Sequence, residues 1–207
     1  MSFAIARNPT SPSRRGPSSP TWMTFLRTHA ADMIAIDFFV VPTVRFEILF
    51  VFLILAHDRR RVLHFNVTMN PSAEWTAQQI VEAFPWSDVS ACLLRDRDGI
   101  YGAHFQRRVR GLGIEQVLTA PRSPWQNPYV ERLIGSIRRE CLDHVVVLNE
   151  RHLKNVLRSY FSYYHGWRTH QSLDRDARNG RPIQSVGNVI EIGEVRGLHH
   201  HYERRAA

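Results

Sequence analysis

A single aspartate interrupts an apolar run that otherwise has the pattern of a buried strand. The run is Met33-Ile-Ala-Ile-Asp-Phe-Phe-Val-Val41, with Asp37 at its centre. Its β-branched and aromatic residues do not alternate with polar ones, which predicts a strand covered on both faces of a sheet. An unpaired carboxylate buried there would cost several kcal/mol. The pattern therefore predicts a partner for Asp37, either a metal ion or a basic side chain.

Two further carboxylates stand at the boundaries of expected elements. Asp96 ends a short run that begins Ala91-Cys-Leu-Leu94 and is followed by a polar stretch with a glycine, so it lies where a strand opens into a loop. Glu131 lies 35 positions later, at the start of a helical pattern. Three acids are thus carried by three separate elements.

The order of the expected elements is strand, strand, strand, helix, strand, helix, strand, helix. The first three strands are joined by short links, so we expect them to pair as antiparallel hairpins, with Asp58 in a turn and outside any acid site. The first helix is expected to begin at Asn70-Pro71, with Asn70 as its N-cap, and to end before Pro85. The remaining elements are predicted from the spacing of their apolar residues and from glycines that end a helix. The expected strands are 33–41, 46–56, 62–67, one around 93–94, and 116–118; the later helices are 103–110, one that includes Glu131, and 150–165.

These residues resemble the DDE transposases and retroviral-type integrases over about residues 33–175. The last two acids of that family stand at about the separation seen here, and its Asn-x-x-x-Glu pattern is matched by Asn127 and Glu131. The chain departs from the family where Asp98 replaces a glycine two positions after Asp96. Tyr101 keeps the family's aromatic in register, which favours Asp96 as the second acid.

The resemblance implies an α/β fold with an RNase H-like core. This core would hold a mixed five-stranded sheet flanked by helices in βββαβαβα order, plus a C-terminal helix. The division that we expect has three parts. Residues 1–30 would be a disordered or truncated N-terminal segment, residues 31–175 the catalytic core, and residues 176–207 a C-terminal tail. The histidine-rich stretch 198–202 is expected to be a solvated part of that tail, with a metal site as the alternative.

The resemblance also implies that Asp37, Asp96 and Glu131 are the catalytic residues and the metal ligands. Phosphodiester chemistry of this kind uses two Mg²⁺ (or Mn²⁺) ions about 4 Å apart, held by oxygen ligands. We expect Asp37 to bridge the two ions. The alternative is that each acid pairs with an arginine. Glu140 follows on the same helix, but more than two turns beyond Glu131, which places it out of reach of the same ions.

Residues expected to bind DNA lie mainly around Glu131. The loop 119–128 offers charge, stacking and hydrogen-bonding groups that suit a splayed DNA end. Alternatives are a surface loop in which Trp125 packs on the core, a solvated basic helix face, and a structural role for Arg168 and His170. The full expected set is Arg122, Trp125, Gln126, Asn127, Tyr129, Arg132, Arg138, Arg139, Arg168 and His170.

Composition favours a polyanionic partner inside a cell. The formal net charge is +8 and the pI about 10.3, which favours nucleic acid over a membrane surface. Cys92 and Cys141 show no disulfide or CxxC pattern, as expected in a reducing cytoplasm. The apolar stretch 48–56 is too short to span a bilayer. We therefore expect a cytoplasmic protein without membrane partners, and the resemblance to bacterial transposases implies a bacterial protein associated with the nucleoid.

The function expected from these features is that of a DNA transposase or integrase. It would cleave and transfer DNA strands by metal-dependent in-line transesterification, as a homo-oligomer on its DNA. About thirty residues precede the first strand, too few for a separate recognition domain, so DNA binding without sequence preference is expected. Two alternatives remain open. One is a catalytically silent DNA-binding or assembly remnant of a mobile element, and the other is an RNase H-like hydrolytic nuclease.

Overall fold

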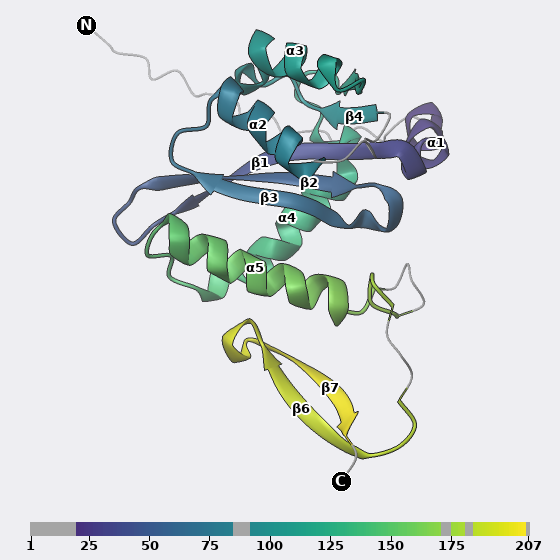
Figure 1. Ribbon diagram of the computed structural model, residues 1–207, viewed down its shortest axis with the longest axis vertical. Helices are drawn as coiled ribbons and strands as arrows, with labels where there is room; N and C mark the ends of the chain where they lie inside the picture. Colours follow the sequence, from purple (N-terminus) through teal and green to yellow (C-terminus); the bar gives the residue numbers. More distant parts are fainter. Residues whose placement is uncertain (1–19, 85–91, 171–174, 181–183, 206–207) are drawn as a thin grey trace, which may run out of the picture.

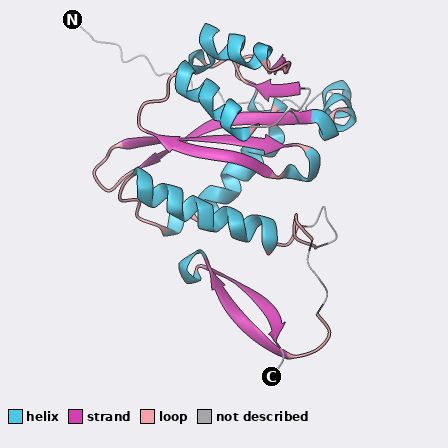
Figure 2. Cartoon of the chain, in the orientation of Figure 1, coloured by secondary structure: helices cyan, strands magenta, loops and turns pink. Residues whose placement is uncertain are grey.

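A mixed five-stranded sheet forms the centre of the molecule (Figures 1 and 2). The computed structural model describes residues 20–84, 92–170, 175–180 and 184–205. The strand order is β3-β2-β1-β4-β5, with antiparallel pairing among the first three strands and parallel pairing of β1 with β4 and of β4 with β5. The predicted hairpins and mixed sheet are thereby confirmed. The strands are β1 (Met33–Pro42), β2 (Ile48–Ala56), β3 (Val62–Thr68), β4 (Cys92–Arg95) and β5 (Glu115–Leu118).

Helices cover both faces of this sheet. Helices α2 (Ala73–Ala83) and α3 (Ala103–Gly111) lie on one face, and α4 (Pro128–Glu140) and α5 (Glu150–Gly166) on the other (Figure 1). Strand β2 shows why its apolar residues do not alternate with polar ones. Its odd-numbered residues 51, 53 and 55 enter the core under α4 and α5, while 52 and 54 enter the core under α2 and α3. The element order is the predicted RNase H-like order.

The start of α2 differs from the prediction. Ser72 is the N-cap, and its hydroxyl accepts a hydrogen bond of 3.1 Å from the backbone N–H of Trp75. The backbone N–H of Asn70 instead donates to the hydroxyl of Thr68 at 3.1 Å. Asn70 therefore belongs to the turn that ends β3. Ser72 caps the helix because its oxygen reaches an otherwise unsatisfied N–H of the first turn.

Part of the expected N-terminal disordered segment is a helix, α1 (Pro20–Thr28). Leu26 is fully buried, and Trp22 and Phe25 pack against the same core as α4 and α5. The indole N–H of Trp22 also donates to the carbonyl of Gln126 at 3.0 Å. The prediction was wrong for residues 20–28, because these long-range contacts leave no signal in a segment rich in Ser and Pro. Residues 1–19 lie outside the described residues.

The expected C-terminal tail is a β-hairpin, made of β6 (Asn188–Glu194) and β7 (His199–Arg205), which lies beyond α5 in Figure 1. The ring of His201 stacks on Trp167 with centroids 3.6 Å apart, and His199 stacks on Tyr163 at 4.4 Å. The prediction of a solvated histidine-rich tail was therefore wrong, because these two rings are held against aromatic side chains at and just beyond the end of α5.

Two further features bear on the expected setting of the chain. Both cysteines, Cys92 and Cys141, are free. No helix in the described parts of the chain combines the length and apolar character needed to cross a bilayer.

Candidate active site

The sheet brings two of the predicted acids together. In the parallel pairing of β1 and β4, Ala35 lies opposite Leu94. Asp37 and Asp96 each lie two positions further along their own chain, so neighbouring strands deliver both carboxylates in the same direction. Glu131 joins them from the first turn of α4. All three acids line one cavity of about 300 Å³.

The electrostatics of this cavity are those of acids held close together. The pKa of Asp37 is raised to about 7, first by burial and then by the negative charges of Glu131, Asp96 and Asp98, although a hydrogen bond from the N–H of Phe38 opposes the shift. The pKa of Glu131 is also raised, by burial and by Asp96. The charged forms of Asp37 and Glu131 are thus disfavoured by burial and by neighbouring carboxylates, so the site would gain from bound cations.

The neighbouring arginines do not neutralise these acids. Arg95 donates to the side chain of Gln116 at 2.9 Å and to the backbone carbonyl of Asp96 at 2.8 Å. Arg97 donates to the backbone carbonyl of Thr119 at 3.1 Å. Within the described residues, no ion pair to an arginine or lysine involves Asp37, Asp96 or Glu131. The alternative in which each acid pairs with an arginine therefore finds no support in the described contacts.

Asp96 and Asp98 both line the cavity but have different local tasks. The carboxylate of Asp98 accepts from the N–H of Ile100 at 2.9 Å and caps the short helix η3 (Gly99–Tyr101). Asp96 accepts from the N–H of Asp98 at 3.0 Å. The capping hydrogen bond accounts for the Asp98 carboxylate without a bound metal ion. Asp96 is therefore the better candidate for the second metal ligand.

Asn127 ties the loop before α4 to the strand that carries Asp37. Its side chain is buried, and its amide nitrogen lies 3.4 Å from the carbonyl oxygen of Ile36. Its amide oxygen has no hydrogen-bond partner among the described residues. An unsatisfied amide oxygen beside several carboxylates is a donor set that suits a hard divalent cation.

No three acidic, histidine or cysteine side chains in the described parts of the chain form a ready-made site for one metal ion. The predicted arrangement does not require such a group. With Asp37 shared, each of two ions would have two protein carboxylates, and water or phosphate oxygens would complete the shell. The chemistry of the cavity therefore fits oxygen-liganded divalent cations.

The residues of the predicted DNA-binding loop lie at two adjoining cavities. Arg122 is exposed at the acid cavity and has a left-handed backbone with φ 55°. Trp125, Arg132 and Arg139 line a neighbouring cavity of about 440 Å³ along the outer face of α4. The side-chain carbonyl of Gln126 accepts from the N–H of Ala120 at 2.6 Å and braces the loop.

Two predicted DNA-binding residues have contacts away from the acids. The guanidinium of Arg138 lies 5.7 Å from the ring of Phe39 and 3.4 Å from the carbonyl oxygen of Val40, at the far end of β1. Tyr129 is half-buried, and its ring contacts His57 edge-on, with centroids 4.9 Å apart. The guanidinium of Arg60 covers the same ring at 4.5 Å.

Arg168 and His170 lie in a separate polar cluster. Arg168 donates to both carboxylate oxygens of Glu140, at 2.7 and 2.6 Å, and Tyr160 donates to one of them at 2.8 Å. The pKa of buried His170 is lowered to about 4, by burial and by the charges of Arg178 and Arg168, so its ring is neutral at pH 7. These contacts correspond to the structural role that the sequence left open for this pair. The hydrogen bonds from Arg168 and Tyr160 also account for the position of the Glu140 carboxylate without a bound metal ion.

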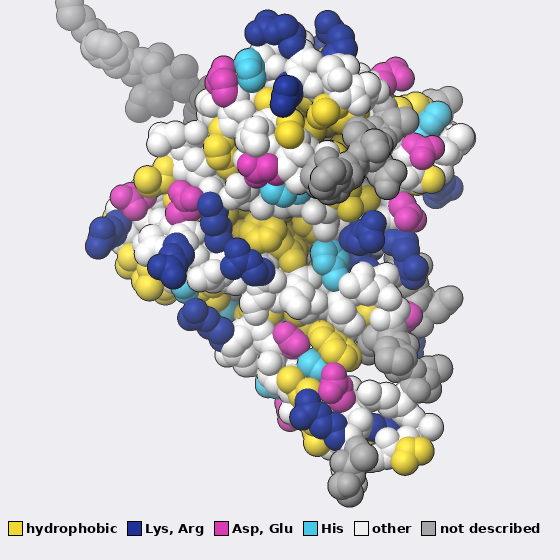
Figure 3. Space-filling view, in the orientation of Figure 1, with side chains coloured by type: hydrophobic (Ala, Val, Ile, Leu, Met, Phe, Trp, Pro, Cys, Tyr) yellow, Lys and Arg dark blue, Asp and Glu magenta, His cyan; other side chains and the backbone are white. Residues whose placement is uncertain are grey.

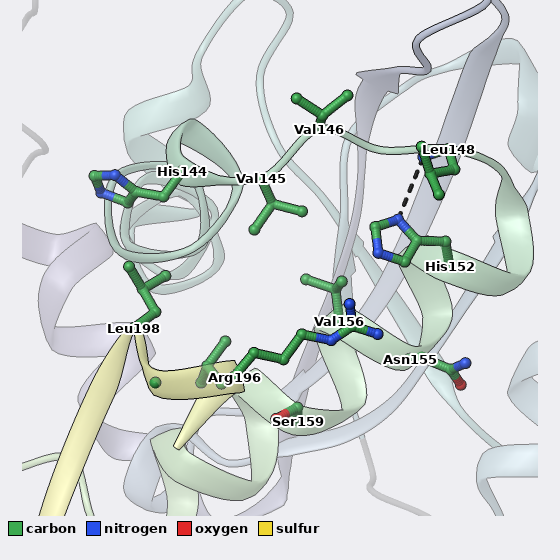
Figure 4. Close-up of a pocket in the computed structure, with 12 residues that line it drawn as sticks. His144, Val145, Val146, Leu148, His152, Asn155, Val156, Ser159, Arg196 and Leu198 are labelled. Carbon is green, nitrogen blue, oxygen red and sulfur yellow. Dashed lines mark hydrogen bonds between the residues drawn. The ribbon is translucent and has the colours of Figure 1, made fainter. Parts of the chain in front are cut away.

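A third cavity, of about 610 Å³, lies between α5, the segment before it and the turn of the β6–β7 hairpin (Figure 4). Its histidines bind the backbone: His144 contacts the carbonyl of Arg139 at 3.0 Å, and His152 accepts from the N–H of Leu148 at 3.3 Å. None of the described residues that line it carries a carboxylate. Its walls therefore offer no chemistry comparable to that of the acid cavity.

Among the residues that line the acid cavity, the polar side chains of Arg97, Thr119 and Ser123 were not singled out as site residues, although Thr119 and Ser123 belong to the predicted loop 119–128. Arg97 directly follows Asp96, so adjacency was an available signal. Thr119 is placed by a backbone hydrogen bond of 3.0 Å to Arg95, which continues the pairing of β4 and β5. On the face drawn in Figure 3, Lys and Arg side chains are scattered rather than gathered in one patch.

Comparisons with known proteins agree with this fold. A family model described as integrase core domain matches residues 112–177. A chain of the simian T-cell lymphotropic virus intasome, solved in complex with PP2A regulatory subunit B56 gamma, has a TM-score of 0.61 at 11% identity. The match covers 82% of this chain and 65% of that one, so this chain spans less than two thirds of its length.

Two catalytic domains superpose on this chain over more of their own length. The HTLV-2 integrase catalytic core domain in complex with magnesium has a TM-score of 0.57 at 11% identity, covering 72% of this chain and 93% of that one. The Mos1 mariner transposase catalytic domain has a TM-score of 0.59 at 14% identity, covering 76% and 85%. No curated protein sequence matches the chain.

The fold is that of integrase and transposase catalytic cores, and the predicted resemblance to DDE transposases and retroviral-type integrases is confirmed. The matched segment 112–177 contains Glu131 and its preceding loop, while Asp37 and Asp96 precede it. At these identities the solved structures support the fold, and the chemistry must be argued from the cavity itself.

Proposed function

We propose that this chain is the catalytic core of a DNA transposase or integrase. Its reaction is metal-dependent cleavage of a DNA strand followed by transfer of the new 3′ end to a second DNA strand. The observation that carries the proposal is the convergence of Asp37, Asp96 and Glu131 on one cavity without an arginine or lysine partner among the described residues.

The cavity residues would hold two Mg²⁺ or Mn²⁺ ions, with Asp37 shared and Asp96 and Glu131 on one ion each. When bound, such ions activate the attacking hydroxyl and neutralise charge that builds up on the phosphate. The carboxylates fix where that charge is neutralised. The raised pKa of Asp37, about 7 without ions, supports this role, because an acid cluster of this kind binds cations at the expense of protons.

The nucleophile in this proposal comes from water or DNA. The described side chains around the cavity include no lysine, histidine or cysteine. The hydroxyl of Ser123 donates to the carbonyl of Pro121 at 3.2 Å and is thereby turned to the backbone. In cleavage, a water oxygen forms a new bond to phosphorus as the 3′-oxygen leaves. In transfer, a DNA 3′-hydroxyl makes that attack and the number of phosphodiester bonds is unchanged.

A direct test is incubation of the chain with end-labelled duplex DNA and Mg²⁺ or Mn²⁺. Products longer than the substrate would support strand transfer, and shortened products alone would support the hydrolytic nuclease. A chain that binds DNA but yields neither product with either ion would support the silent remnant. The acid cavity favours the two enzymatic interpretations over the silent one, because three uncompensated carboxylates destabilise a fold that has no use for them.

The proposed partner is DNA, bound by a homo-oligomer of this chain. The net charge of +8 supports a polyanionic ligand, and the similar structures include an intasome and the trimeric and dimeric forms of an integrase core. Light scattering with and without duplex DNA tests the assembly. A mass that stays at one chain per duplex at all ratios would contradict it. We also propose a bacterial cytoplasmic setting near the nucleoid, as the composition suggested.

A further inference from the structure

Arg95 is a buried cation directly behind the acid cavity. Successive side chains of a strand point to opposite faces, so Arg95, like Leu93, lies on the face of β4 that α3 covers, and Asp96 then lines the cavity. Arg95 is only 4% exposed, and its guanidinium lies 5.2 Å from the ring of Tyr101 and 5.8 Å from that of Phe105. The described contacts include no ion pair between Arg95 and a carboxylate. Burial of a cation without an opposite charge is destabilising, so a gain in stability does not explain this arginine.

Two glutamines continue a chain of hydrogen bonds that begins at Arg95. The Nε of Arg95 donates to the side-chain carbonyl of Gln116 at 2.9 Å. The pairing of β4 with β5 sets Gln116 opposite Leu93, so it shares a face with Arg95. The side-chain amide of Gln116 donates to the backbone carbonyl of Gln106 at 3.4 Å, and the side-chain amide of Gln106 donates to the carbonyl of Tyr101 at 2.9 Å. We call the side chains of Arg95, Gln106 and Gln116 the clamp, because they join β4, α3 and β5.

The clamp holds both ends of the segment 96–101, which carries two acids of the cavity. At the start of the segment, the Nη1 of Arg95 donates to the backbone carbonyl of Asp96 at 2.8 Å. At its end, Gln106 holds the last carbonyl. The carboxylates of Asp96 and Asp98 accept from N–H groups two positions further on, so these two bonds stay within the segment. They fix its local shape, whereas the clamp fixes its position on the sheet.

We propose that the clamp positions Asp96 for metal binding. Arg95 and Gln116 are positioning residues in this proposal, because they act through the backbone of Asp96 and line none of the cavities described above. The inference rests on the proposed function for the role of Asp96 as a metal ligand. Mg²⁺ takes its oxygen ligands at about 2.0–2.1 Å with little tolerance, so a carboxylate at the start of a loop binds well only where that loop is held. Groups that orient a ligand without touching the ion typically alter metal affinity about ten- to a hundredfold.

The shape of the guanidinium explains why the clamp uses an arginine. Arginine donates in several directions from one rigid plane, and here Nε and Nη1 of Arg95 reach a side chain of β5 and the backbone that follows β4. Lysine would bring the same charge but donate from a single flexible point. The positive charge alone is a competing explanation, because burial lowers the pKa of Arg95 while Tyr101 and Asp96 oppose that shift. A lysine at this position separates the two explanations.

The test compares wild type with Gln116→Met, Arg95→Lys and Gln79→Met. Gln116→Met removes the acceptor of the Arg95 Nε and leaves the charge of Arg95 in place. Gln79→Met is the matched control. Gln79 is a buried glutamine of α2 on the same side of the sheet, and its carbonyl lies 2.9 Å from the Nε2 of His64 and accepts from Asn66 at 2.7 Å. It lines none of the cavities described above and has no described hydrogen bond to the segment 96–101.

Two measurements are made on each protein. Calorimetry gives the Kd for Mn²⁺, and amide hydrogen exchange in EDTA reports how firmly the segment 96–101 is held. Gln116→Met should raise the Kd for Mn²⁺ about ten- to a hundredfold and speed exchange in the segment. Arg95→Lys should show losses of the same kind, because lysine lacks the planar fork. Gln79→Met should lower the melting temperature but keep the wild-type Kd and the wild-type exchange in this segment.

Three results would overturn the proposal. The first is a wild-type Kd and wild-type exchange in Gln116→Met. The second is a Kd that rises equally in Gln79→Met, since general loss of core hydrogen bonds would then explain the effect. The third is a wild-type Kd in Arg95→Lys, which would show that charge rather than the fork sets the affinity. Thermal melts identify a variant that fails to fold. If Gln116→Met fails, Gln106→Met replaces it, because it frees the other end of the segment.

Failure of the clamp and failure of the proposed reaction give different results. A wild type that cleaves and joins DNA, together with a Gln116→Met that binds Mn²⁺ as wild type does, would refute the clamp and leave the reaction standing. A wild type that yields no DNA product with Mg²⁺ or Mn²⁺, together with the expected losses in Gln116→Met, would refute the reaction and leave the clamp standing. A wild type that binds no Mn²⁺ would refute both.

Discussion

Asp37 in β1 and Glu131 in α4 are 94 positions apart in sequence, yet after burial the charge of Glu131 is the largest cause of the raised pKa of Asp37. The fold therefore holds the carboxylates of Asp37 and Glu131 close enough to repel each other. Such an arrangement is common where a protein binds cations or transfers protons. It also has consequences for stability that can be measured without any substrate.

Asp37→Asn should stabilise the metal-free chain at pH 8. The folded chain binds a proton at Asp37 with a pKa of about 7, against 3.8 as the ordinary value. The contribution of Asp37 to the free energy of unfolding is thus fully present below about pH 4 and is lost as the pH rises through 7. The gain in melting temperature on substitution should therefore grow between pH 4 and 8 in EDTA.

Glu131→Gln should shift this pH dependence. Without the charge of Glu131, the pKa of Asp37 falls. The gain in melting temperature caused by Asp37→Asn should therefore develop at lower pH when Glu131→Gln is already present than it does in the wild-type chain. The measurement is a double-mutant cycle of melting temperatures against pH. A gain that is independent of pH would contradict the electrostatic account of the site.

Mg²⁺ or Mn²⁺ should raise the melting temperature of wild type. Ions that bind only the folded chain stabilise it according to their concentration, and a tenfold excess over Kd corresponds to about 3–6 °C for a chain of this size. Asp37→Asn should reduce the shift at equal ion concentration. If the mutant responded as wild type does, the ions would be bound elsewhere on the chain.

Arg168→Ala should destabilise the fold by about 2–4 kcal/mol, because Glu140 would keep a half-buried carboxylate without its bidentate partner. Arg168→Lys should recover only part of this loss, since lysine lacks the planar fork. Burial raises the pKa of Glu140, but the hydrogen bonds from Arg168 and Tyr160 outweigh it, so the pKa is lowered overall. The contribution of ionised Glu140 to the stability of the fold is therefore lost as the pH falls through this lowered pKa. Equal urea midpoints for all three proteins at pH 7 would show that the pair contributes nothing.

DNA binding by this chain should be weak, insensitive to sequence and strongly dependent on salt. The net charge is +8, and basic side chains on the face drawn in Figure 3 are scattered, so we expect affinity to come mainly from counterion release. Affinity should fall about a hundredfold or more between about 50 and 200 mM salt. Titrations of the chain with its own element's ends and with scrambled duplex provide the test. A hundredfold preference for the ends at both salt concentrations would show that sequence is read within this chain.

The elements of the core were predictable because each has a local signal. The apolar runs of β1 and β2 are buried on both faces, and short links force them into hairpins. The position of Asp37 followed from its place in the middle of an apolar run, and that of Asp96 from the point where a strand opens into a loop. Glu131 followed from its spacing and from the resemblance.

The remaining features depend on contacts between distant residues. Helix α1 is held by Trp22, whose indole reaches Gln126 across 104 positions. The β6–β7 hairpin is held by His201 on Trp167 and by His199 on Tyr163. Neither α1 nor the hairpin has a strongly apolar sequence of its own, so local patterns describe them as tails.

The most direct test of the central claim compares four single variants in a DNA cleavage and joining assay with Mg²⁺ or Mn²⁺. Asp37→Asn, Asp96→Asn and Glu131→Gln should each reduce product formation by at least about a thousandfold, while folding and DNA affinity stay near those of wild type. Asp98→Asn, which changes a helix cap beside the same cavity, should retain substantial activity. Near-normal activity after any one of the first three changes would contradict the account, and selective loss in Asp98→Asn would move the second ligand from Asp96 to Asp98.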